Sequence, residues 1–378
     1  MPPSAIAADS APALTFGPIR SIIMQPTTLC NLDCDYCYLP FRRDRLDMSP
    51  AVAKAVARNV ATLAVPIDSI EIVWHGGEPT AIGIETLRRL CDAFDPLPVV
   101  HTIQTNATRI NDDWCEFFEA RDMKVGVSID GPIESNRHRL DLAGRQTWTR
   151  TMRGIEHLRA AGIPFTAITV VDDPDPAKAR ELYEFFVSLG CTSLGINIEE
   201  TEGVNTAQRH EDGRGLGLER TTRFWEAITA AWEANPALHL RELDRIADYL
   251  RSPDAGPPVD WVDPIPTVEW NGNVTLLSPE LAGFTDERLG GFTSGNILKH
   301  DFAELLARAV DAPWVREFAA GQAACAKTCE YYQSCGGGQA SNKFFEHGRL
   351  DGTRTDYCTG SKITTMEGVL AHARRNTR

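Results

Sequence analysis

The chain reads Ile19-Arg-Ser-Ile-Ile-Met24 and then, five residues later, Cys30-Asn-Leu-Asp-Cys34-Asp-Tyr-Cys37. The first run is rich in isoleucine, which predicts a buried strand. Three thiolates on the loop after this strand can each hold one iron of a cubane cluster, which leaves the fourth iron open. Because structural metal sites are closed, an open position indicates chemistry at the metal. A zinc site that borrows a distant ligand such as His75 is the alternative.

Strands of the same kind recur as one reads outward from this stretch. They are expected at Ile19–Met24, Ser69–Trp74, Val99–Gln104, Lys124–Ile129, Pro164–Val171 and Ser193–Ile198. Helical periodicity lies between them, at Pro50–Ala64, Ile84–Phe94, Asp112–Arg121, Thr149–Ala161 and Pro176–Leu189. Strands that alternate with helices form parallel βαβ units, and six such units are two short of a closed eight-stranded barrel. We therefore predict an α/β fold with a partial (β/α)6 TIM-like barrel.

The pattern changes after Ile198. We expect a loop over Thr201–Leu218, helices over Glu219–Ala234 and Pro236–Leu250, and a linker over Ser252–Pro266. Thr267–Leu277 contains Asn271-Gly272, which predicts a hairpin turn, and Gly295–Cys358 is predicted to be rich in loops. The predicted divisions are an N-terminal extension (1–18), a barrel core (19–200), a helical insertion and linker (201–266), a C-terminal domain (267–362) and a tail (363–378).

The composition narrows the class of partner. The 378 residues include 38 basic and 52 acidic side chains, a net charge of −14. This balance argues against binding to nucleic acid or to an anionic membrane, and it favours a small molecule or a neutral to basic peptide. No run of uncharged apolar residues is long enough for a membrane span, and residues 1–18 carry no basic side chain of the kind a secretory signal needs. We expect a cytoplasmic protein.

Seven of the ten cysteines fall into two groups. The other three, Cys91, Cys115 and Cys191, stand alone and are predicted to be buried as small hydrophobic residues. The second group has the spacing Cys325-x3-Cys329-x5-Cys335-x22-Cys358 and supplies four thiolates, enough to close a tetrahedral or a cubane site. Either a structural zinc site or an iron–sulfur cluster is compatible with this spacing.

The first cysteine motif resembles the signature of the radical SAM superfamily. That resemblance implies a [4Fe–4S] cluster whose open iron binds S-adenosylmethionine (SAM), and a 5′-deoxyadenosyl radical that abstracts hydrogen. Three further motifs are similar to those of the family: Trp74-His-Gly-Gly-Glu-Pro79, Ile103-Gln-Thr-Asn-Ala107, where Ala107 replaces a glycine, and Ser128-Ile-Asp-Gly-Pro132 with Arg139. The resemblance implies cofactor contacts at Tyr36, Gly76, Gly77, Glu78, Gln104, Ser128 and Arg139.

The C-terminal part resembles the SPASM extension of radical SAM enzymes that modify peptides. Gln339 stands where that family has its next cysteine, so the resemblance implies two [4Fe–4S] clusters, one that binds SAM and one auxiliary. The stretch from Cys335 to Cys358 is similar to the cyclophane-forming maturases, which join an aromatic ring carbon to the β-carbon of a nearby residue of a ribosomal precursor peptide. Flavodoxin or ferredoxin is the implied electron donor.

Two questions stay open at this level. Removal of the ring proton needs a base, and Glu199, Glu200, Asp263 and Glu269 are candidates because they lie near predicted strand ends or the domain junction. The alternatives to cyclophane formation are oxidation of a Cys or Ser to formylglycine in a sulfatase, thioether formation, and an iron–sulfur binding module without catalysis. The leader peptide is expected to dock on the barrel, on 201–266 or on the SPASM-like part.

Overall fold

The computed structural model describes residues 14–63, 70–205, 217–252 and 261–376. Its main sheet contains ten strands in the order β14-β11-β10-β2-β3-β4-β5-β6-β7-β8. The six strands predicted for the barrel are β2 (Ser21–Met24), β3 (Glu71–Trp74), β4 (Val100–Thr105), β5 (Lys124–Ser128), β6 (Phe165–Val171) and β7 (Ser193–Ile198). Each pairs in parallel with the next, as the alternating pattern predicts.

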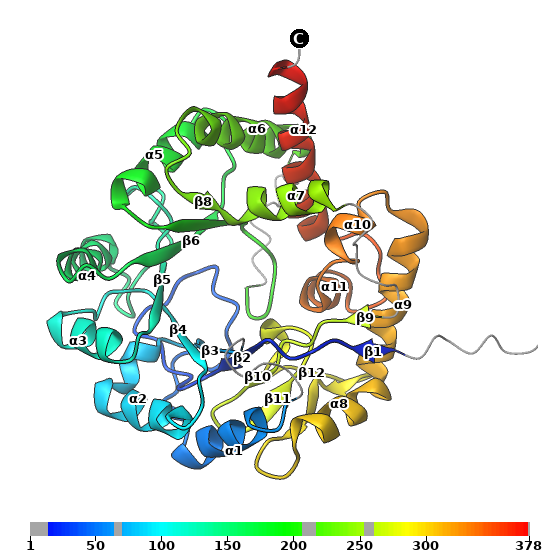
Figure 1. The fold of residues 1–378 in the computed structure, drawn as a ribbon. Coiled ribbons are helices and arrows are strands. Elements are labelled where there is room, and N and C mark those ends of the chain that lie inside the picture. Colours follow the sequence, from blue (N-terminus) through cyan, green and yellow to red (C-terminus); the bar gives the residue numbers. More distant parts are fainter. Residues whose placement is uncertain (1–13, 64–69, 206–216, 253–260, 377–378) are drawn as a thin grey trace, which may run out of the picture.

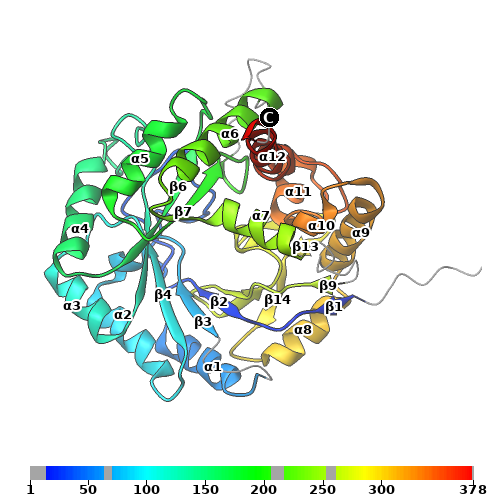
Figure 2. The ribbon, with the colours of Figure 1, turned by 45° about the horizontal axis from the view of Figure 1, so that its top comes forward.

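One helix follows each of these strands. They are α1 (Pro50–Val60), α2 (Ile84–Cys91), α3 (Asp112–Ala120), α4 (Trp148–Ala160), α5 (Ala179–Leu189) and α6 (Leu218–Ala234). They form an arc outside the curved sheet (Figure 1; Figure 2). The six units confirm the partial (β/α)6 barrel.

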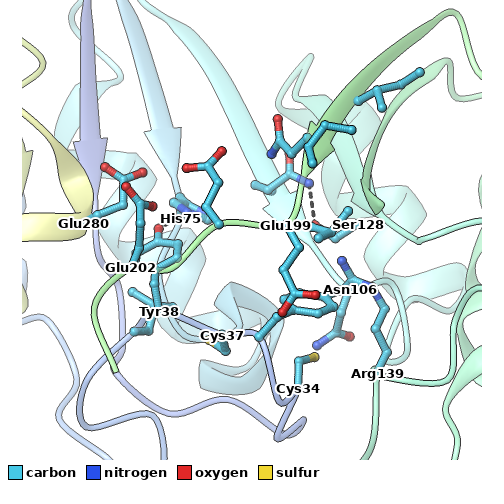
Figure 3. A pocket seen from close by; sticks show the side chains of 18 of the residues that line it. Cys34, Cys37, Tyr38, His75, Asn106, Ser128, Arg139, Glu199, Glu202 and Glu280 are labelled. Carbon is cyan, nitrogen blue, oxygen red and sulfur yellow. Dashed lines mark hydrogen bonds between the residues drawn. The ribbon is translucent and has the colours of Figure 1, made fainter. Parts of the chain in front are cut away.

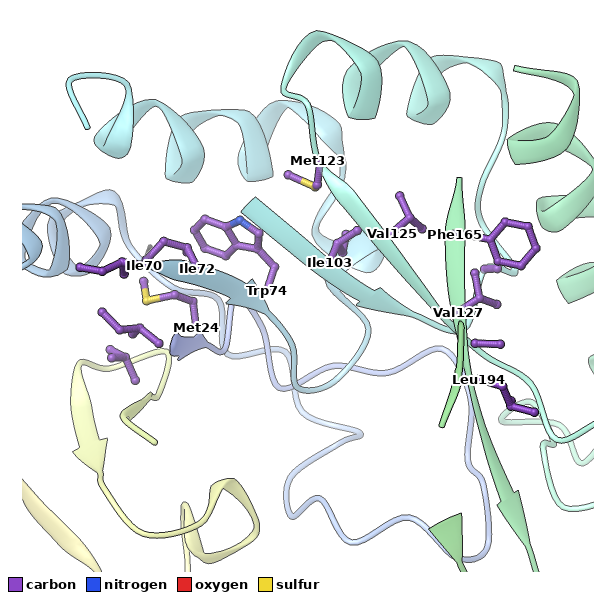
Figure 4. Close-up of a cluster of buried hydrophobic side chains, with 14 of the residues drawn as sticks. Met24, Ile70, Ile72, Trp74, Ile103, Met123, Val125, Val127, Phe165 and Leu194 are labelled. Carbon is purple, nitrogen blue, oxygen red and sulfur yellow. The ribbon is translucent and has the colours of Figure 1, made fainter. Parts of the chain in front are cut away.

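The core lies between the sheet and this arc of helices. Met24, Ile72, Trp74 and Ile103 are fully buried and face the helices (Figure 4). Along β2, β3 and β4 buried residues alternate with half-buried ones. Since side chains alternate across a strand, the half-buried positions point to the opposite face of the sheet. One face of the sheet is therefore dry, and the other is free to line a cavity.

Beyond the barrel, residues 206–216 of the predicted loop and 253–260 of the predicted linker lie outside the described residues. Two expectations about the other residues need correction. The helix predicted over Pro236–Leu250 is a short strand, β8 (His239–Leu240), followed by α7 (Arg241–Arg251). The region Gly295–Cys358 is not rich in loops. It contains four helices: α8 (Phe302–Val310), α9 (Pro313–Thr328), α10 (Tyr332–Cys335) and α11 (Ala340–His347).

The hairpin predicted around Asn271-Gly272 is confirmed. It consists of β10 (Thr267–Val268) and β11 (Asn273–Thr275), and Gly272 has a φ of +87°, which glycine adopts without strain. β14 (Thr293–Asn296) pairs with β11, and β10 pairs in parallel with β2. The hairpin thus extends the barrel sheet across the predicted boundary at 266. The domain limits themselves stay a prediction.

The predicted tail is a helix that packs on the barrel. α12 (Thr364–Asn376) follows the π-helical segment η6 (Cys358–Ile363) and lies against α6 (Figure 2). A side chain at Gly368 would meet the Cβ of Trp225 at 2.5 Å, so glycine is needed for this close approach. His372 Nε2 lies 2.6 Å from Glu233 Oε2 on α6. None of the helices in the described ranges is both long and apolar enough to cross a membrane.

Candidate active site at the carboxyl ends of the strands

A cavity of about 420 Å³ lies on the polar side of the sheet, a volume within the roughly 300–1,000 Å³ typical of ligand sites. It collects most of the residues that the motifs indicate, namely Cys30, Cys34, Tyr36, Cys37, Gly77, Glu78, Gln104, Ser128, Arg139, Glu199 and Glu200 (Figure 3). Gly76, Asp263 and Glu269 do not line it. The strand ends of a parallel α/β unit are where such a site is expected.

Glu78 is buried, and hydrogen bonds hold both of its carboxylate oxygens. Oε1 accepts bonds from Thr80 N at 3.0 Å, from Thr80 Oγ1 at 2.6 Å and from Thr105 Oγ1 at 2.6 Å. Oε2 accepts one bond, from Asn106 N at 2.8 Å, and so retains capacity for another donor. The motif analysis missed Thr80, Thr105 and Asn106, although the last two belong to the quoted Gln-Thr-Asn stretch. Asn106 Nδ2 lies 4.0 Å from Cys30 Sγ and links this network to the cysteine loop.

Arg139 is held in place by a buried carboxylate that sequence reasoning missed. Its Nε lies 3.0 Å from Asp130 Oδ2, and its guanidinium lies 5.6 Å from the centre of the Tyr36 ring. The Tyr36 hydroxyl donates to the same Asp130 Oδ2 at 2.6 Å, and Asp130 Oδ1 accepts from Val170 N at 3.1 Å. Burial disfavours the charge of Arg139, but the Asp130 carboxylate, Tyr36 and Cys34 together outweigh burial and raise its pKa. Arg139 is therefore a fixed cation on the cavity wall.

Gln104 and Ser128 lie side by side on β4 and β5. Gln104 Nε2 donates to Ser128 Oγ at 2.8 Å, the bond drawn in Figure 3. A side chain at Gly126 would meet Gln104 Oε1 at 2.3 Å, so the glycine leaves room for the glutamine. Both polar groups face the cavity, as the motif resemblance implies for cofactor contacts.

The two glycines of the Gly-Gly-Glu-Pro motif allow the chain to pack against itself. A Cβ at Gly77 would lie 2.6 Å from the carbonyl oxygen of Leu29, and a Cβ at Gly76 would lie 2.9 Å from Gln25 Cγ. Glu78 N also donates to Leu29 O at 2.8 Å. The turn therefore braces the backbone that leads into Cys30.

Replacement of Gly77 by alanine is expected to displace this backbone and weaken SAM binding by at least about tenfold, which corresponds to about 1.4 kcal/mol. Gly83→Ala is the matched control, because Gly77 and Gly83 both have positive φ (+59° and +83°) but a Cβ at Gly83 meets nothing within 4 Å. Equilibrium dialysis with labelled SAM measures the difference. Equal affinities of the two variants would contradict the bracing role.

Besides Glu78 and Glu242, four glutamates line the same cavity: Glu199, Glu200, Glu202 and Glu280. Burial raises the pKa of Glu200, Glu202 and Glu280. Sequence reasoning missed Glu202 and Glu280, since neither belongs to a motif. The other two candidate bases, Asp263 and Glu269, lie elsewhere.

Asp263 Oδ1 accepts a hydrogen bond from Trp261 Nε1 at 2.7 Å. Glu269 is buried in a separate small cavity beside Phe41 and Trp270, and burial raises its pKa. The structure thus brings Glu199 and Glu200 to the cysteine loop and leaves Asp263 and Glu269 outside that cavity.

His75, the possible extra ligand of a zinc site, also lines the cavity. Its Nε2 lies 3.1 Å from the Tyr38 hydroxyl, and burial lowers its pKa to about 4. Over the parts of the chain that the structure describes, no three His, Cys, Asp or Glu side chains converge as a single metal ion requires. In a cubane each thiolate binds a different iron, so the thiolates need not converge on one point. The donor set at Cys30, Cys34 and Cys37 therefore fits a cluster better than it fits zinc.

The second cysteine group surrounds a smaller cavity. Cys325, Cys329, Cys335 and Cys358 all line it, together with Lys343 and Lys362. Lys343 is buried, and its Nζ lies 3.9 Å from Cys325 Sγ. Gly337 and Gly338 have φ values of +92° and +82°, which lets the backbone turn tightly after Cys335. Four thiols and a buried cation suit an anionic cluster. Lys362 lines this cavity and the larger one.

Comparison with known proteins agrees with this arrangement. Residues 24–186 match the model of the radical SAM superfamily. The chain is 31% identical over 357 residues to uncharacterized protein sll1766 of Synechocystis sp., covering 91% of this chain and 89% of that protein. It is also 31% identical over 220 residues to the serine-type anaerobic sulfatase-maturating enzyme of Klebsiella aerogenes, which covers 56% of this chain and 53% of the enzyme. The chain thus matches about half the length of that enzyme.

Solved structures share the fold. The structure of anSMEcpe with bound AdoMet superposes with a TM-score of 0.74 at 20% identity, over 94% of this chain and 95% of that one. Streptococcus suis SuiB bound to its precursor peptide SuiA superposes with a TM-score of 0.64 at 16% identity, over 89% and 75%. These likenesses show the fold, and the match to the family model and to the sequence relatives leads to one conclusion. The chain is an enzyme of the radical SAM superfamily, whose members bind a [4Fe–4S] cluster and SAM.

Proposed function

We propose that the enzyme cross-links an aromatic ring carbon to the β-carbon of a nearby residue in a ribosomally made precursor peptide. The observation that carries this proposal is the single cavity that joins three cysteines, the motif residues implied to contact SAM and a set of carboxylates. When bound, the cluster and SAM supply a 5′-deoxyadenosyl radical that removes a hydrogen atom.

The chain's own side chains would hold these groups. Cys30, Cys34 and Cys37 each provide one thiolate. The free capacity of Glu78 Oε2 suits the ammonium of SAM, and the guanidinium of Arg139 suits its carboxylate. Because Asp130 and Tyr36 already fix Arg139, the guanidinium needs little reorganisation when it binds.

A cavity carboxylate would take up the proton that the ring releases. Glu199 and Glu200 lie at the end of β7 and line the cavity with the cysteines. Burial raises the pKa of Glu200, which makes it a stronger base once it is ionised. Asp263 and Glu269 lie outside this cavity and do not enter the proposal.

A second cluster at Cys325, Cys329, Cys335 and Cys358 would accept the electron that remains. The peptide then loses two hydrogens in total, one as an atom to the adenosyl group and one as a proton to a glutamate. Lys362 borders both cavities, so the acceptor lies next to the reaction site. Flavodoxin or ferredoxin is the proposed donor of the first electron, in the cytoplasm.

A peptide substrate has support from relatives as well as from the cavity. SuiB was solved with the precursor peptide SuiA, and it shares the fold of this chain. The similarity to a serine-type sulfatase-maturating enzyme favours a second candidate, the oxidation of a serine to formylglycine. Both reactions remove two hydrogens, so the mass change alone does not separate them.

The test uses the reconstituted enzyme with SAM, dithionite and short aromatic-containing peptides encoded beside its gene, together with a serine-containing sulfatase peptide. We expect 5′-deoxyadenosine and a loss of about two hydrogens from an encoded peptide, as a radical-driven cross-link requires. Tandem mass spectrometry should then show no backbone fragments between the joined residues. A carbonyl that reacts with a hydrazide, on the sulfatase peptide, would decide for formylglycine instead.

A further inference from the structure

Three glutamates form one group at the wall of the reaction cavity; Glu202 is buried, and Glu200 and Glu280 are half-buried. Glu200 and Glu202 follow β7, and Glu280 belongs to the short 3-10 helix Pro279–Leu281. All three line the cavity that contains the cysteine loop. Figure 3 shows the carboxylates of Glu202 and Glu280 close together, near Tyr38 and His75. Glu202 is only 7% exposed.

Helix α11 closes the group with two further oxygen atoms. Asn342 Nδ2 donates to Glu200 Oε2 at 2.8 Å, and the Ser341 hydroxyl lies close enough to lower the pKa of both Glu202 and Glu280. Ser341 and Asn342 are completely buried. We call Glu200, Glu202, Glu280, Ser341 and Asn342 the carboxylate site.

Two acceptors in the carboxylate site have no donor. Glu202 Oε1 and Asn342 Oδ1 are buried without a hydrogen-bond partner among the described residues. None of the ion pairs among the described residues involves these three glutamates, although Arg241, Arg245 and Lys362 line the same cavity. Lys362 affects the pKa of Glu200, but its ammonium lies over the Tyr357 ring, 5.4 Å from the ring centre. Buried carboxylates normally occur with a cation or with donors that satisfy them.

From this geometry we infer that the carboxylate site binds a cationic group of the substrate peptide, the ammonium of a lysine or the guanidinium of an arginine. The inference rests on the proposed function, because the peptide must enter the cavity to reach the site. A metal ion is a poorer match, since no group of three His, Cys, Asp or Glu side chains in the described ranges is arranged to hold one. An organic cation satisfies several separated acceptors at once, because it carries several N–H donors.

The raised pKa values of Glu200, Glu202 and Glu280 fit this role. Burial and mutual repulsion disfavour three charges when no cation is bound. A bound ammonium or guanidinium would compensate these charges, and the partial burial of the site strengthens such charge pairing relative to bulk water. The site would thus select a basic residue and place the neighbouring residue of the peptide near the cysteine loop.

The test measures the affinity of neutral and cationic probes of the same shape. The probes are acetyl-Trp-Gly-Lys-amide, its arginine analogue and its norleucine analogue, titrated by calorimetry into the anaerobic, reconstituted full chain with SAM. A fourth probe, Trp-Gly-norleucine-amide without the acetyl group, shows whether the site binds an N-terminal amine instead of a basic side chain. We expect the lysine or the arginine probe to bind at least about tenfold tighter than the acetylated norleucine probe.

Two variants test whether the preference for a cationic probe depends on the carboxylate site. In Glu202→Gln combined with Glu280→Gln, the ratio of lysine to norleucine affinity is expected to fall towards one. Glu219→Gln is the matched control, because Glu219 is exposed on the outer helix α6 and should keep the full ratio. Iron content and a thermal melt show whether each variant has folded. The comparison of probes on the unaltered enzyme needs no variant at all.

Equal affinities of the three acetylated probes would overturn the inference, and so would a failure of both cationic probes to bind measurably. Tighter binding of the free-amine probe alone would overturn it as well. If these glutamates act only as bases, the double variant loses turnover, but the affinity of the unaltered enzyme does not depend on the charge of the probe. That result would also overturn the inference. Mass spectrometry of the same mixtures tests the proposed function separately. A charge preference without loss of hydrogen would refute the cross-linking proposal and leave the carboxylate site intact.

Discussion

Cys34→Ala is expected to lower the rate of 5′-deoxyadenosine formation by at least about three orders of magnitude. Cys34 lines the reaction cavity with the other two cysteines of its loop, and two thiolates do not hold the SAM-binding cluster. The iron content should fall from about eight to about four atoms per chain, because the four distant cysteines keep their own cluster. Chromatography of the anaerobic reaction and iron analysis measure the two effects.

Cys191→Ala is the matched control. Cys191 is also buried, but it belongs to neither group, and its thiol donates to Phe186 O at 3.6 Å. It should keep the full iron content and the full rate. Activity that survives in Cys34→Ala, or iron that is lost equally from both variants, would contradict the assignment of the first cluster.

Arg139→Ala is expected to cost about 3–5 kcal/mol of unfolding free energy, the usual loss when one partner of a buried ion pair is removed. The Asp130 side chain is completely buried, so its charge would remain without a cation. Urea unfolding under anaerobic conditions measures the loss. SAM binding should also weaken, since the guanidinium is the proposed partner of the SAM carboxylate.

The double variant Asp130→Asn with Arg139→Met separates these two effects. Removal of both charges should restore much of the stability, because no unpaired charge remains buried. SAM binding should stay weak in the double variant. A single variant Arg139→Ala that is as stable as the unaltered chain would show that the Asp130 pair does not support the fold.

The barrel could be predicted because each of its strands is a short β-branched run and each helix shows a 3.6-residue period. The C-terminal helices were missed for a physical reason. α10 and α11 have four and eight residues, end at Gly336 and Gly348 in the left-handed region, and lie among cysteines and glycines. Such composition is typical of loops, and only packing against the rest of the chain stabilises helices this short.

Some residues of the candidate site could likewise be predicted from the sequence, and others could not. Cys30, Glu78, Ser128 and Arg139 were recognised because motifs in the linear sequence contain them. Glu280 was missed, since it reaches the cavity only because the hairpin places Pro279–Leu281 beside the cysteine loop. Asp130 was inside a quoted motif, yet its pairing with Arg139 depends on the loop between them. The linear sequence carries no signal for contacts of this kind.

The pairing of β10 with β2 has a consequence for electron transfer. The segment that carries Cys325 to Cys358 is continuous with a hairpin hydrogen-bonded to the strand that precedes Cys30, and η6 contacts β7. The two cysteine groups are therefore connected through hydrogen-bonded strands of one sheet as well as through the chain between them. An electron that passes from one group to the other would cross between two parts of the chain that this shared sheet joins.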